Sequence, residues 1–458
     1  MDSTIISIHW HDKCQPVYSL HFQPRPARSR RLATAGGDNN VRVWRVKCPS
    51  SNDALQVTVE YLSTLRKHTQ AVNAVRFDPS GCLLATASDD GLLLVWSLSP
   101  TVVVDFGHQD DEPVESWVVL QVHCTNLEIY DLAWSPDSQY IIVSCMDNSS
   151  RIYNVAADLK ECDLSTHSHY VQGVAWDPKN AFIASMSADR SLHVYSVDAS
   201  SSALKVSNVM KADKTDQYPQ LVSALDPQKP LEKRSAHLYY SETLQSFFRR
   251  LAFSPDGSLL LTPLGVFKRT DLAGTETDVS SESATLNTVY AYIRSGFDRP
   301  PICHIPGLSK PAVAISFNRN LYHLSSSGSS AIALPYKMVF AVATQNSVLI
   351  YDTQQLQPLG VASNLNYLTI TDITWEDDGQ SLMVSSVEGF CFMIVFEKEV
   401  FGPVYTEEVK ASKNSEKPSQ MHVNQPAVLP VTKETNLSEP KGASKKKRIV
   451  PTLVQDYK

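Results

Sequence analysis

Histidine and aspartate recur together in the first half of the chain, a combination that suggests acid–base catalysis when it occurs alone. Here each histidine stands upstream of an aspartate, and each aspartate stands six residues before a large aromatic residue. A serine or threonine between them could join the pair by hydrogen bonds, which a buried aspartate requires. Because the arrangement repeats, we interpret it as a structural network rather than a catalytic centre. The predicted network residues are His68, Asp90 and Trp96, then His123, Asp147 and Tyr153, then His167, Asp189 and Tyr195, with Asp38 and Trp44 opening the series.

The spacing of these residues indicates a repeat architecture. In three of the stretches a second aromatic stands 19 residues before the first, at Phe77, Trp134 and Trp176. The histidine stands 28 residues before the aromatic in two units and 30 before it in the unit of His123, which therefore carries a two-residue insertion. Each unit alternates apolar strands with PSG, PDS or PDG turns, in which proline, aspartate and glycine favour a tight reversal.

Seven such units lie between about residue 10 and residue 398, three of them with weaker signals. The sequence therefore predicts an all-β fold, a seven-bladed WD-repeat β-propeller over residues 1–404, followed by a disordered basic tail at 405–458. Polar insertions are expected at about 97–118, 198–245 and 269–287, as binding loops or disordered segments. The acidic side chains in the first insertion could meet a basic partner or could be solvated.

Composition is typical of a soluble intracellular protein, with 43% hydrophobic residues and no apolar run of membrane-spanning length. The eight cysteines include no CxxC pair, and the N-terminal residues lack the pattern of a secretory signal. The chain carries a net charge of −7, and its tail carries +4, so residues 1–404 carry −11. An acidic main domain is not expected to grip DNA, so any DNA contact should be indirect.

Motifs for phosphate binding, for hydrolase nucleophiles and for zinc proteases do not occur in the sequence. His9, His11 and Cys14 would give a zinc ion three ligands, and no fourth follows at a recognised spacing. We therefore expect a non-enzymatic binding scaffold without metal or cofactor, although propellers can hold active sites in their central channel. Converging, unpaired titratable groups at the channel mouth would favour an enzyme instead.

The tail contains one sharper segment, SKKKRIVPTLV at residues 444–454. Its compact basic cluster, Lys445, Lys446, Lys447 and Arg448, is typical of a nuclear import signal. Import does not require the apolar residues that follow, and these suit strand addition to the sheet edge of a partner. The two functions are compatible. The apolar extension comprises Ile449, Val450, Pro451, Leu453 and Val454.

Four strings give the chain a specific resemblance: PVYSLHFQP near the start, YVQGVAWDP at 170–178, SFFRRLAFSPDGSLLLTP at 246–263 and LPYKMVFAVATQNSVLIYDTQQ at 334–355. Together they resemble the middle, WD-repeat subunit of chromatin assembly factor 1 over the whole predicted propeller. The resemblance implies a nuclear histone chaperone subunit that helps deposit newly made histones onto replicating DNA. The alternatives are a HIR-type histone chaperone, whose similar propeller precedes a long second domain, and a generic WD-repeat scaffold of another nuclear complex. The 54-residue tail favours the assembly-factor subunit.

The resemblance also implies partners. They are the large acidic subunit and the small WD-repeat subunit of chromatin assembly factor 1, core histones directly or through the complex, and the anti-silencing-function histone chaperone. Members of the family dock on that chaperone through a short basic-then-apolar motif, and no membrane is implied. The residues here that match the motif, within 445–454, are Lys446, Lys447, Arg448, Ile449, Pro451 and Leu453.

Two adjacent arginines, Arg249 and Arg250, stand in the string FFRRLAF. Neighbouring residues on a strand point to opposite faces, so we expect only one of them on the buried side. One arginine could contact the large subunit or histones. Alternatively, it could form an intramolecular ion pair that ties down the 198–245 insertion.

Overall fold

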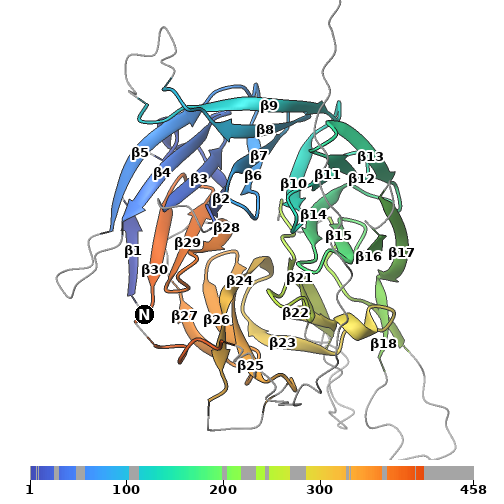
Figure 1. Ribbon diagram of the computed structural model, residues 1–458. Helices are drawn as coiled ribbons and strands as arrows, with labels where there is room; N and C mark the ends of the chain where they lie inside the picture. Colours follow the sequence, from blue (N-terminus) through green and yellow to red (C-terminus); the bar gives the residue numbers. More distant parts are fainter. Residues whose placement is uncertain are drawn as a thin grey trace, which may run out of the picture. The chain divides into compact units, whose positions relative to one another are not determined.

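The computed structural model describes residues 2–6, 8, 10–24, 30–47, 57–102, 113–198, 204–217, 234–242, 247–268, 285–325, 330, 332–363, 369–397 and 399–406. These residues form seven four-stranded antiparallel sheets arranged as a ring (Figure 1). The predicted seven-bladed propeller is therefore confirmed. Residues 1–406 make one compact unit. Residues 407–458, which include the predicted import and docking motifs, lie outside the described residues.

The first strand of each sheet lies nearest the centre of the ring and the fourth lies on the outer rim (Figure 1). Blade 1 contains β2 (Val17–Phe22), β3 (Arg31–Gly36), β4 (Val41–Lys47) and β5 (Thr58–Leu65). Blade 2 contains β6 (Val72–Phe77), β7 (Leu83–Ser88), β8 (Leu92–Leu98) and β9 (Trp117–Cys124). Blade 3 contains β10 (Ile129–Trp134), β11 (Tyr140–Cys145), β12 (Ser150–Asn154) and β13 (Leu159–Leu164). Blade 4 contains β14 (Val171–Trp176), β15 (Phe182–Ser187), β16 (Leu192–Asp198) and β17 (Lys205–Ala212).

The remaining blades follow the same order. Blade 5 contains β20 (Ala252–Phe253), β21 (Leu259–Lys268), β22 (Thr285–Ile293) and β23 (Cys303–Leu308). Blade 6 contains β24 (Ala312–His323), β25 (Tyr336–Thr344), β26 (Val348–Asp352) and β27 (Pro358–Ala362). Blade 7 contains β28 (Ile370–Trp375), β29 (Ser381–Ser386) and β30 (Cys391–Val395), with β1 (Asp2–Ile6) as its outer strand. Two short 3-10 helices among the described residues, η1 (Asp12–Cys14) and η3 (Arg294–Gly296), lie in connections.

The two ends of the propeller chain meet in blade 7. Strand β1 pairs antiparallel with β30, so that Asp2 stands opposite Val395. The sequence units placed between residues 10 and 398 did not include this strand. Because β1 and β30 come from opposite ends of the domain, their ladder joins the first and last parts of the chain and covers an edge that would otherwise be exposed.

The hydrophobic core lies between blades. The described residues form seven clusters of buried apolar side chains, and each cluster joins two neighbouring sheets. The cluster between blades 7 and 1, for example, packs Met383 and Met393 against Leu20 and Leu32. Alternation along the strands places apolar residues on both faces of each sheet, so every blade needs two neighbours. A closed ring satisfies that requirement for all seven.

The PDG turns form as the sequence predicts. In blade 5 the Asp256 carboxylate accepts hydrogen bonds from Ser254 Oγ at 2.6 Å and from the Ser258 backbone N–H at 3.0 Å. Gly257 follows with φ of +68°, a left-handed conformation that costs a glycine little. The carboxylate and the glycine therefore fix the tight link from β20 to β21.

The predicted insertions contain more regular structure than expected. The segment 198–245 supplies the outer strand β17 and a separate hairpin, β18 (Lys214–Gln217) paired with β19 (Arg234–His237). Strand β9 begins inside the segment 97–118, and β22 begins inside 269–287. The interpretation of these segments as structureless was therefore partly wrong. The outer strand β17 lacks clear alternation, because the consecutive residues Ser207, Asn208 and Val209 are all exposed.

Candidate functional site

Two of the predicted networks are present in the expected form. In blade 2 the Asp90 carboxylate can only accept, so His68 donates from Nδ1 over 3.0 Å. Thr86 Oγ1 lies 2.8 Å from His68 Nε2 and accepts a hydrogen bond from Trp96 Nε1 at 3.0 Å. The result is one continuous hydrogen-bonded chain from the loop before β6 to β8.

Blade 4 contains the matching arrangement. His167 Nδ1 lies 3.1 Å from Asp189 Oδ2, and His167 Nε2 lies 2.8 Å from Ser185 Oγ. The aromatic member is a tyrosine here, and its hydroxyl lies 2.5 Å from Thr166 Oγ1 and 3.5 Å from Ser185 Oγ. Tyr195 therefore closes the chain through its hydroxyl, as an indole N–H does in blade 2.

Blade 1 has a network whose histidine the sequence pattern did not identify. His11 Nδ1 lies 2.7 Å from Asp38 Oδ1, and its Nε2 lies 3.1 Å from Thr34 Oγ1, which accepts from Trp44 at 2.9 Å. His11 stands 27 residues before its aspartate, whereas His68 stands 22 before Asp90, so the period alone misses it. Both ring nitrogens of His11 are engaged, and His9 lies outside the described residues.

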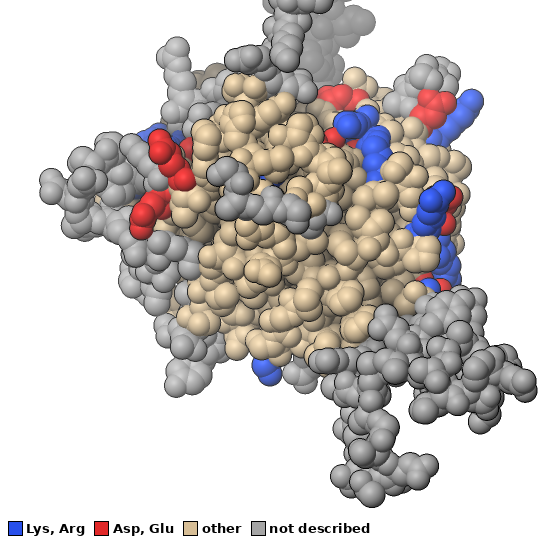
Figure 2. Space-filling model, turned by 90° about the horizontal axis from the view of Figure 1, so that it is seen from below, with Lys and Arg blue, Asp and Glu red and all other residues tan. Residues whose placement is uncertain are grey.

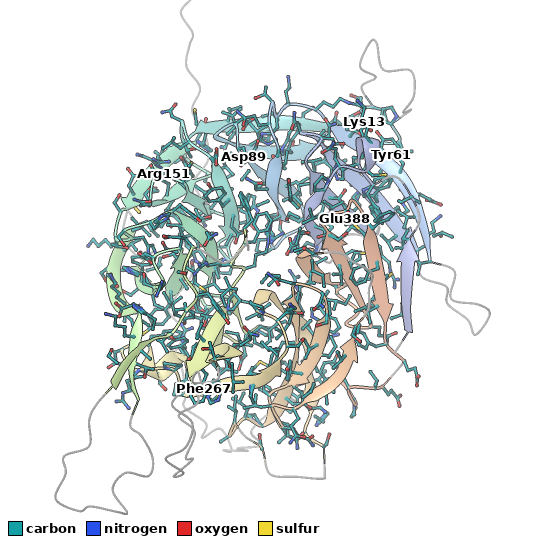
Figure 3. The ribbon with its side chains drawn as sticks, turned by 180° about the vertical axis from the view of Figure 1, so that it is seen from behind. Lys13, Tyr61, Asp89, Arg151, Phe267 and Glu388 are labelled. Carbon is teal, nitrogen blue, oxygen red and sulfur yellow. The ribbon has the colours of Figure 1, made fainter. Side chains whose placement is uncertain are left out.

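The network predicted for blade 3 does not form. Asp147 pairs with Arg151, which Figure 3 labels on this blade, and it accepts from Ser149 Oγ at 2.5 Å. His123 lies on the outer strand β9, its ring 4.6 Å from the ring of Tyr153 and its Nε2 3.7 Å from Asp158.

The sequence explains this difference in blade 3. The position four residues before the aspartate, which is Thr86 in blade 2, is Val143 here and has no hydroxyl to relay a hydrogen bond. The position 22 residues before Asp147 is Thr125 rather than His123. Among the described residues the buried Tyr153 hydroxyl consequently has no hydrogen-bond partner. His123 stands two residues further from its aromatic than His68 and His167 do, a spacing that we interpreted from the sequence as an insertion. The structure shows instead that His123 does not occupy the network position, so this blade lacks the network.

Blade 5 replaces the histidine with a tyrosine. The hydroxyl of Tyr239 lies 2.9 Å from Thr262 Oγ1 and 2.8 Å from the hydroxyl of Tyr292. All three residues are almost fully buried. Sequence reasoning missed this variant because none of its members is a histidine or an aspartate. A threonine at the relay position between two tyrosines was the only available signal.

The network aspartates are held in the ionised state. Burial alone would raise the pKa of Asp90, but the hydrogen bond from His68 and the backbone N–H groups of Thr69 and Leu92 together hold it below its ordinary value. Burial also acts to raise the pKa values of Asp38 and Asp189, but the hydrogen bonds that these carboxylates accept outweigh it and lower both pKa values. These carboxylates are therefore poor candidates for proton transfer near neutral pH.

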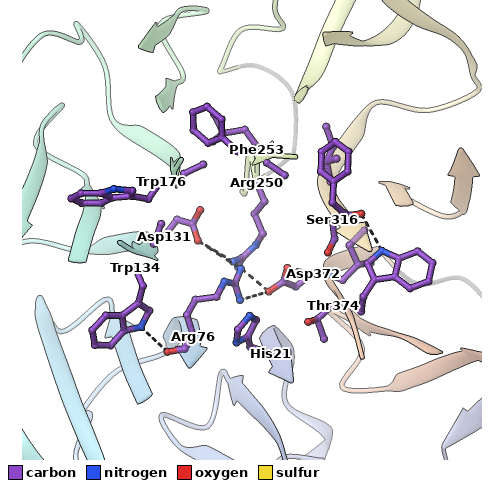
Figure 4. A pocket seen from close by; sticks show the side chains of 18 of the residues that line it. His21, Arg76, Asp131, Trp134, Trp176, Arg250, Phe253, Ser316, Asp372 and Thr374 are labelled. Atoms are coloured by element: carbon purple, nitrogen blue, oxygen red, sulfur yellow. Dashed lines mark hydrogen bonds and ion pairs between the residues drawn. The ribbon is translucent and has the colours of Figure 1, made fainter. Parts of the chain in front are cut away.

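A second cluster of charged residues lies in the central channel (Figure 4). Arg250 Nη1 lies 3.1 Å from Asp131 Oδ1 and 3.4 Å from Asp372 Oδ2. Arg76 Nη1 lies 2.8 Å from the same Asp372 oxygen and donates to Ser19 Oγ at 2.7 Å. The two aspartates and Arg250 are almost completely buried, so each charge depends on the others for compensation.

Backbone groups complete the cluster. Arg250 Nη2 donates to the carbonyl oxygens of Tyr18 at 3.1 Å and Asn73 at 2.9 Å, which belong to blades 1 and 2. With Asp131 on β10 and Asp372 on β28, one guanidinium group contacts four blades besides its own. The ring of Phe248 packs 4.4 Å from the Arg250 guanidinium carbon and adds a cation–π contact.

The two channel aspartates differ in their protonation behaviour. Burial raises the pKa of Asp131, against the opposing charges of Arg250 and Arg76. Burial also acts on Asp372, but Arg250, Arg76 and Ser19 outweigh it and hold its pKa below the ordinary value. Asp372 accepts from Ser19 Oγ at 2.9 Å and from the Leu20 backbone N–H at 3.2 Å, which gives it more donors than Asp131 has.

Both arginines of FFRRLAF are buried, and the expectation of one on each face was wrong. Arg249 is 1% exposed and donates to the carbonyl oxygens of Ser187 at 3.0 Å and Ser241 at 3.2 Å. Residues 247–250 precede β20 and do not form a regular strand, so strict alternation does not apply. The contact with Ser241 does tie down the end of the 198–245 segment, whereas Arg250 turns into the channel.

A glycine allows this segment to pack closely. A Cβ atom placed on Gly173 of β14 would lie 1.9 Å from the Arg249 carbonyl oxygen, a distance that no side chain can accommodate. On its other side the Arg250 backbone N–H donates to the Val313 carbonyl of β24 at 3.1 Å. The backbone of 249–250 is therefore fixed between blades 4 and 6, with Arg250 directed at the two aspartates.

The charges of the site are paired with one another. No group of three or more His, Cys, Asp or Glu side chains among the described residues could hold a metal ion. No helix in the described part of the chain is long and apolar enough to cross a membrane. The arrangement favours a rigid scaffold, because the titratable groups that converge on the channel serve contacts between blades.

The rim carries broad uncharged surface. Figure 2 shows the side that lies at the bottom of Figure 1, and the middle of this view is largely free of charged side chains. The outer strands β23 and β27 contain no Lys, Arg, Asp or Glu. Leu359 and Val361 of β27 are 46% and 48% exposed, and Ile302 before β23 is 47% exposed.

Fold and site together define a WD-type seven-bladed propeller built as a binding scaffold. Residues 1–401 match the CAF1B/HIR1 beta-propeller domain, and the chain belongs to this family. It is 40% identical to the CAF1B subunit of chromatin assembly factor 1 from Saccharomyces cerevisiae and 36% identical to its counterpart in Schizosaccharomyces pombe, over 99% of this chain and 100% of each relative. Protein HIR1 of Kluyveromyces lactis is 25% identical, over 95% of this chain and 47% of that protein. The resemblance to the assembly-factor subunit is thus confirmed.

The blade networks predict a graded response to substitution. Replacing Asp90 with Ala leaves the buried His68 and the backbone N–H groups of Thr69 and Leu92 without their acceptor, and should lower the free energy of unfolding by about 1–3 kcal/mol. Asp147→Ala is the matched control, because that carboxylate is partly exposed and bonds mainly to Arg151, so the loss should be about 1 kcal/mol or less. Melting temperatures of the two variants measure the difference.

The effect of Asp90 should also depend on pH. Its folded-state pKa is below the unfolded value of about 4, so its stabilising contribution is present above that pH and is lost as the pH falls further. The gap in melting temperature between the unmodified protein and Asp90→Ala should therefore narrow in acid. A gap that widens, or equal losses for Asp90→Ala and Asp147→Ala, would show that the network is not what holds blade 2.

Proposed function

We propose that this protein is the middle, WD-repeat subunit of chromatin assembly factor 1, a non-enzymatic histone chaperone subunit that scaffolds the deposition of newly made histones onto replicating DNA. The observation that carries the proposal is the match to two CAF1B relatives along their entire lengths, at 36% and 40% identity. A HIR-type chaperone component is the second candidate, supported by the shared family and by 25% identity over about half of such a relative.

The physical form of the propeller suits a scaffold. A closed ring, tied together through its channel, keeps its outer surfaces in fixed relative positions, as simultaneous binding of several partners requires. The uncharged rim of blades 5 and 6, with Leu359 and Val361 exposed, offers apolar contact area of the kind found at the centres of stable interfaces. The acidic propeller leaves DNA contact to other components of the complex.

The proposed partners are the large and small subunits of chromatin assembly factor 1, core histones and the anti-silencing-function histone chaperone, and the proposed location is the nucleus. The tail residues Lys446 to Leu453 would serve the last of these contacts by strand addition, with Lys445 to Arg448 also serving nuclear import. The propeller surfaces would hold the other subunits, because the polar tail can bury little area.

Purification of the tagged protein from nuclear extract, followed by mass spectrometry, tests the proposed function. We expect the large and small assembly-factor subunits in near-equal amounts, together with histones. Recovery of HIR-type components in place of those subunits would establish the second candidate, and recovery of neither set would reject both.

A truncated chain that ends at Thr406 separates the role of the propeller from that of the tail. This end point keeps Tyr405, whose ring packs 5.3 Å from Tyr336 and whose backbone N–H donates to Leu321, so blade 6 stays complete. The truncated chain should recover the large subunit in the same yield as the full chain. Loss of that subunit would place the principal interface in residues 407–458.

Substitutions in the tail separate docking from import. Ile449→Ala with Leu453→Ala removes the side chains that would fill pockets beside the added strand, so binding of the anti-silencing-function chaperone should be lost while nuclear entry continues. Alanine at Lys445, Lys446 and Lys447 should impair import and weaken docking, more so at low salt, where the lost attraction is less screened. A peptide of residues 441–458 should bind the chaperone in calorimetry. Absence of binding at micromolar concentration would leave the segment as an import signal alone.

A further inference from the structure

A cavity of about 310 Å³ lies in the channel next to the charge cluster (Figure 4). Its walls include one aromatic residue from each blade, close to the end of the innermost strand or at the matching position in β24: Phe22, Phe77, Trp134, Trp176, Phe253, Phe317 and Trp375. The residue before each aromatic also lines the cavity, and several of these are small, as at Ala133, Ala175 and Ala252. Small side chains in this wall of the cavity leave room for a ligand.

His21 presents a fixed hydrogen-bond donor in this cavity. Its Nδ1 accepts the backbone N–H of Phe77 at 3.0 Å, so the neutral ring must carry its proton on Nε2. Among the described residues His21 Nε2 has no hydrogen-bond partner. This atom is not fully buried, so a ligand can reach it. Burial, followed by the charges of Arg76 and Arg319, holds the pKa of His21 well below its ordinary value, which keeps the ring neutral near pH 7.

Arg76 supplies a second donor. Its Nη1 is saturated by contacts to Ser19, Leu20, Val75 and Asp372 at 2.7–3.3 Å. Its Nη2 has only the longer 3.9 Å contact to Asp131 in the described part of the chain. Two N–H groups of a guanidinium therefore remain available. The Arg76 side chain is 18% exposed, so a ligand in the cavity can reach these two N–H groups.

The acceptors of the cavity are already occupied. Asp372 and Asp131 accept from Arg250, Arg76 and backbone N–H groups, and Asp377 pairs with Arg319 at 3.2 Å. The three arginines and three aspartates that line the cavity balance in charge. The cavity therefore has unused hydrogen-bond donors but no net positive charge. Such a site should bind a singly charged acceptor better than a phosphate dianion.

We propose that this cavity binds a carboxylate, held by His21 Nε2 and Arg76 Nη2, with the half-exposed Arg319 as a further positive charge in the lining. The apolar wall of alanines would contact the methylene groups that carry the carboxylate. The ligand is either the side chain of a glutamate in an acidic peptide or a small aliphatic dicarboxylate, since both present the same group. The site is independent of the proposed function and would add a specific anchor point to the channel face.

Calorimetric titration of the full chain at low salt tests the site with three probes: an acetylated, amidated oligoglutamate peptide, the matching oligoglutamine peptide and glutarate. We expect oligoglutamate or glutarate to bind and oligoglutamine not to bind. Binding of the peptide alone identifies a protein ligand, and binding of glutarate identifies a small carboxylate; either supports the site. Equal binding of oligoglutamine, or no binding of either carboxylate at millimolar concentration, overturns it.

Three variants place the binding in the cavity. His21→Asn keeps an acceptor for the Phe77 N–H but removes the Nε2 donor, and should weaken binding about tenfold. Arg319 is half-exposed and lies outside the buried cluster, so Arg319→Gln should weaken carboxylate binding while preserving the fold. Ala252→Leu should block binding, because the larger side chain would fill part of the cavity. Arg299→Gln is the control, since that side chain is 77% exposed and lies outside the cavity. Unchanged affinity in folded Arg319→Gln and Ala252→Leu proteins would show that the carboxylate binds elsewhere.

Discussion

The buried cluster of Arg250, Arg76, Asp131 and Asp372 is the constraint on which the rest of the propeller depends. The two carboxylates and the Arg250 guanidinium group are removed from water at a cost of several kcal/mol, which only the opposite charges and hydrogen bonds of the cluster offset. The groups come from different blades, so the compensation exists only when the ring is closed in one register. Removing any member leaves a buried charge uncompensated. A ring built on this cluster therefore has little freedom to open or slip.

The blade networks act at a shorter range. His68, Thr86 and Trp96 join the entrance of blade 2 to its third strand, and their loss would be felt mainly within that blade. Blade 3 shows that one such network can be absent while the fold persists, since Val143 replaces the relay hydroxyl there. Connections between blades are made by other side chains. Trp134, for instance, donates from its indole N–H to the Arg76 carbonyl of the preceding blade at 3.0 Å.

The sequence predicted the repeat because an aspartate and an aromatic residue recur at the same spacing in the first four blades. It predicted the pairing of His68 with Asp90 for the same reason, since both lie within one period. The pairing of His11 with Asp38 was missed because a longer connection separates them. Strand β1 was missed because its partner β30 lies at the opposite end of the propeller.

The charged cluster in the channel could not be predicted from the repeat period, for a related reason. Arg250 and Asp131 are 119 residues apart, and Arg76 and Asp372 are 296 apart, so only the closed ring brings them together. The alternation rule also failed at Arg249 and Arg250, because their backbone is set by the close approach to Gly173 rather than by a strand. Side chains on separate repeats that meet at the axis can be recognised only once the number of blades and their register are known.

A double-substitution cycle on Arg250→Met and Asp131→Asn tests the central claim most directly. The melting temperature of the full chain is measured for both single variants and for the double variant. If the cluster is one compensated unit, each single variant should melt at a clearly lower temperature, and the double variant should lose much less than the sum of the two losses. Losses that add would contradict the account, because they would mean that the two charges stabilise the ring independently.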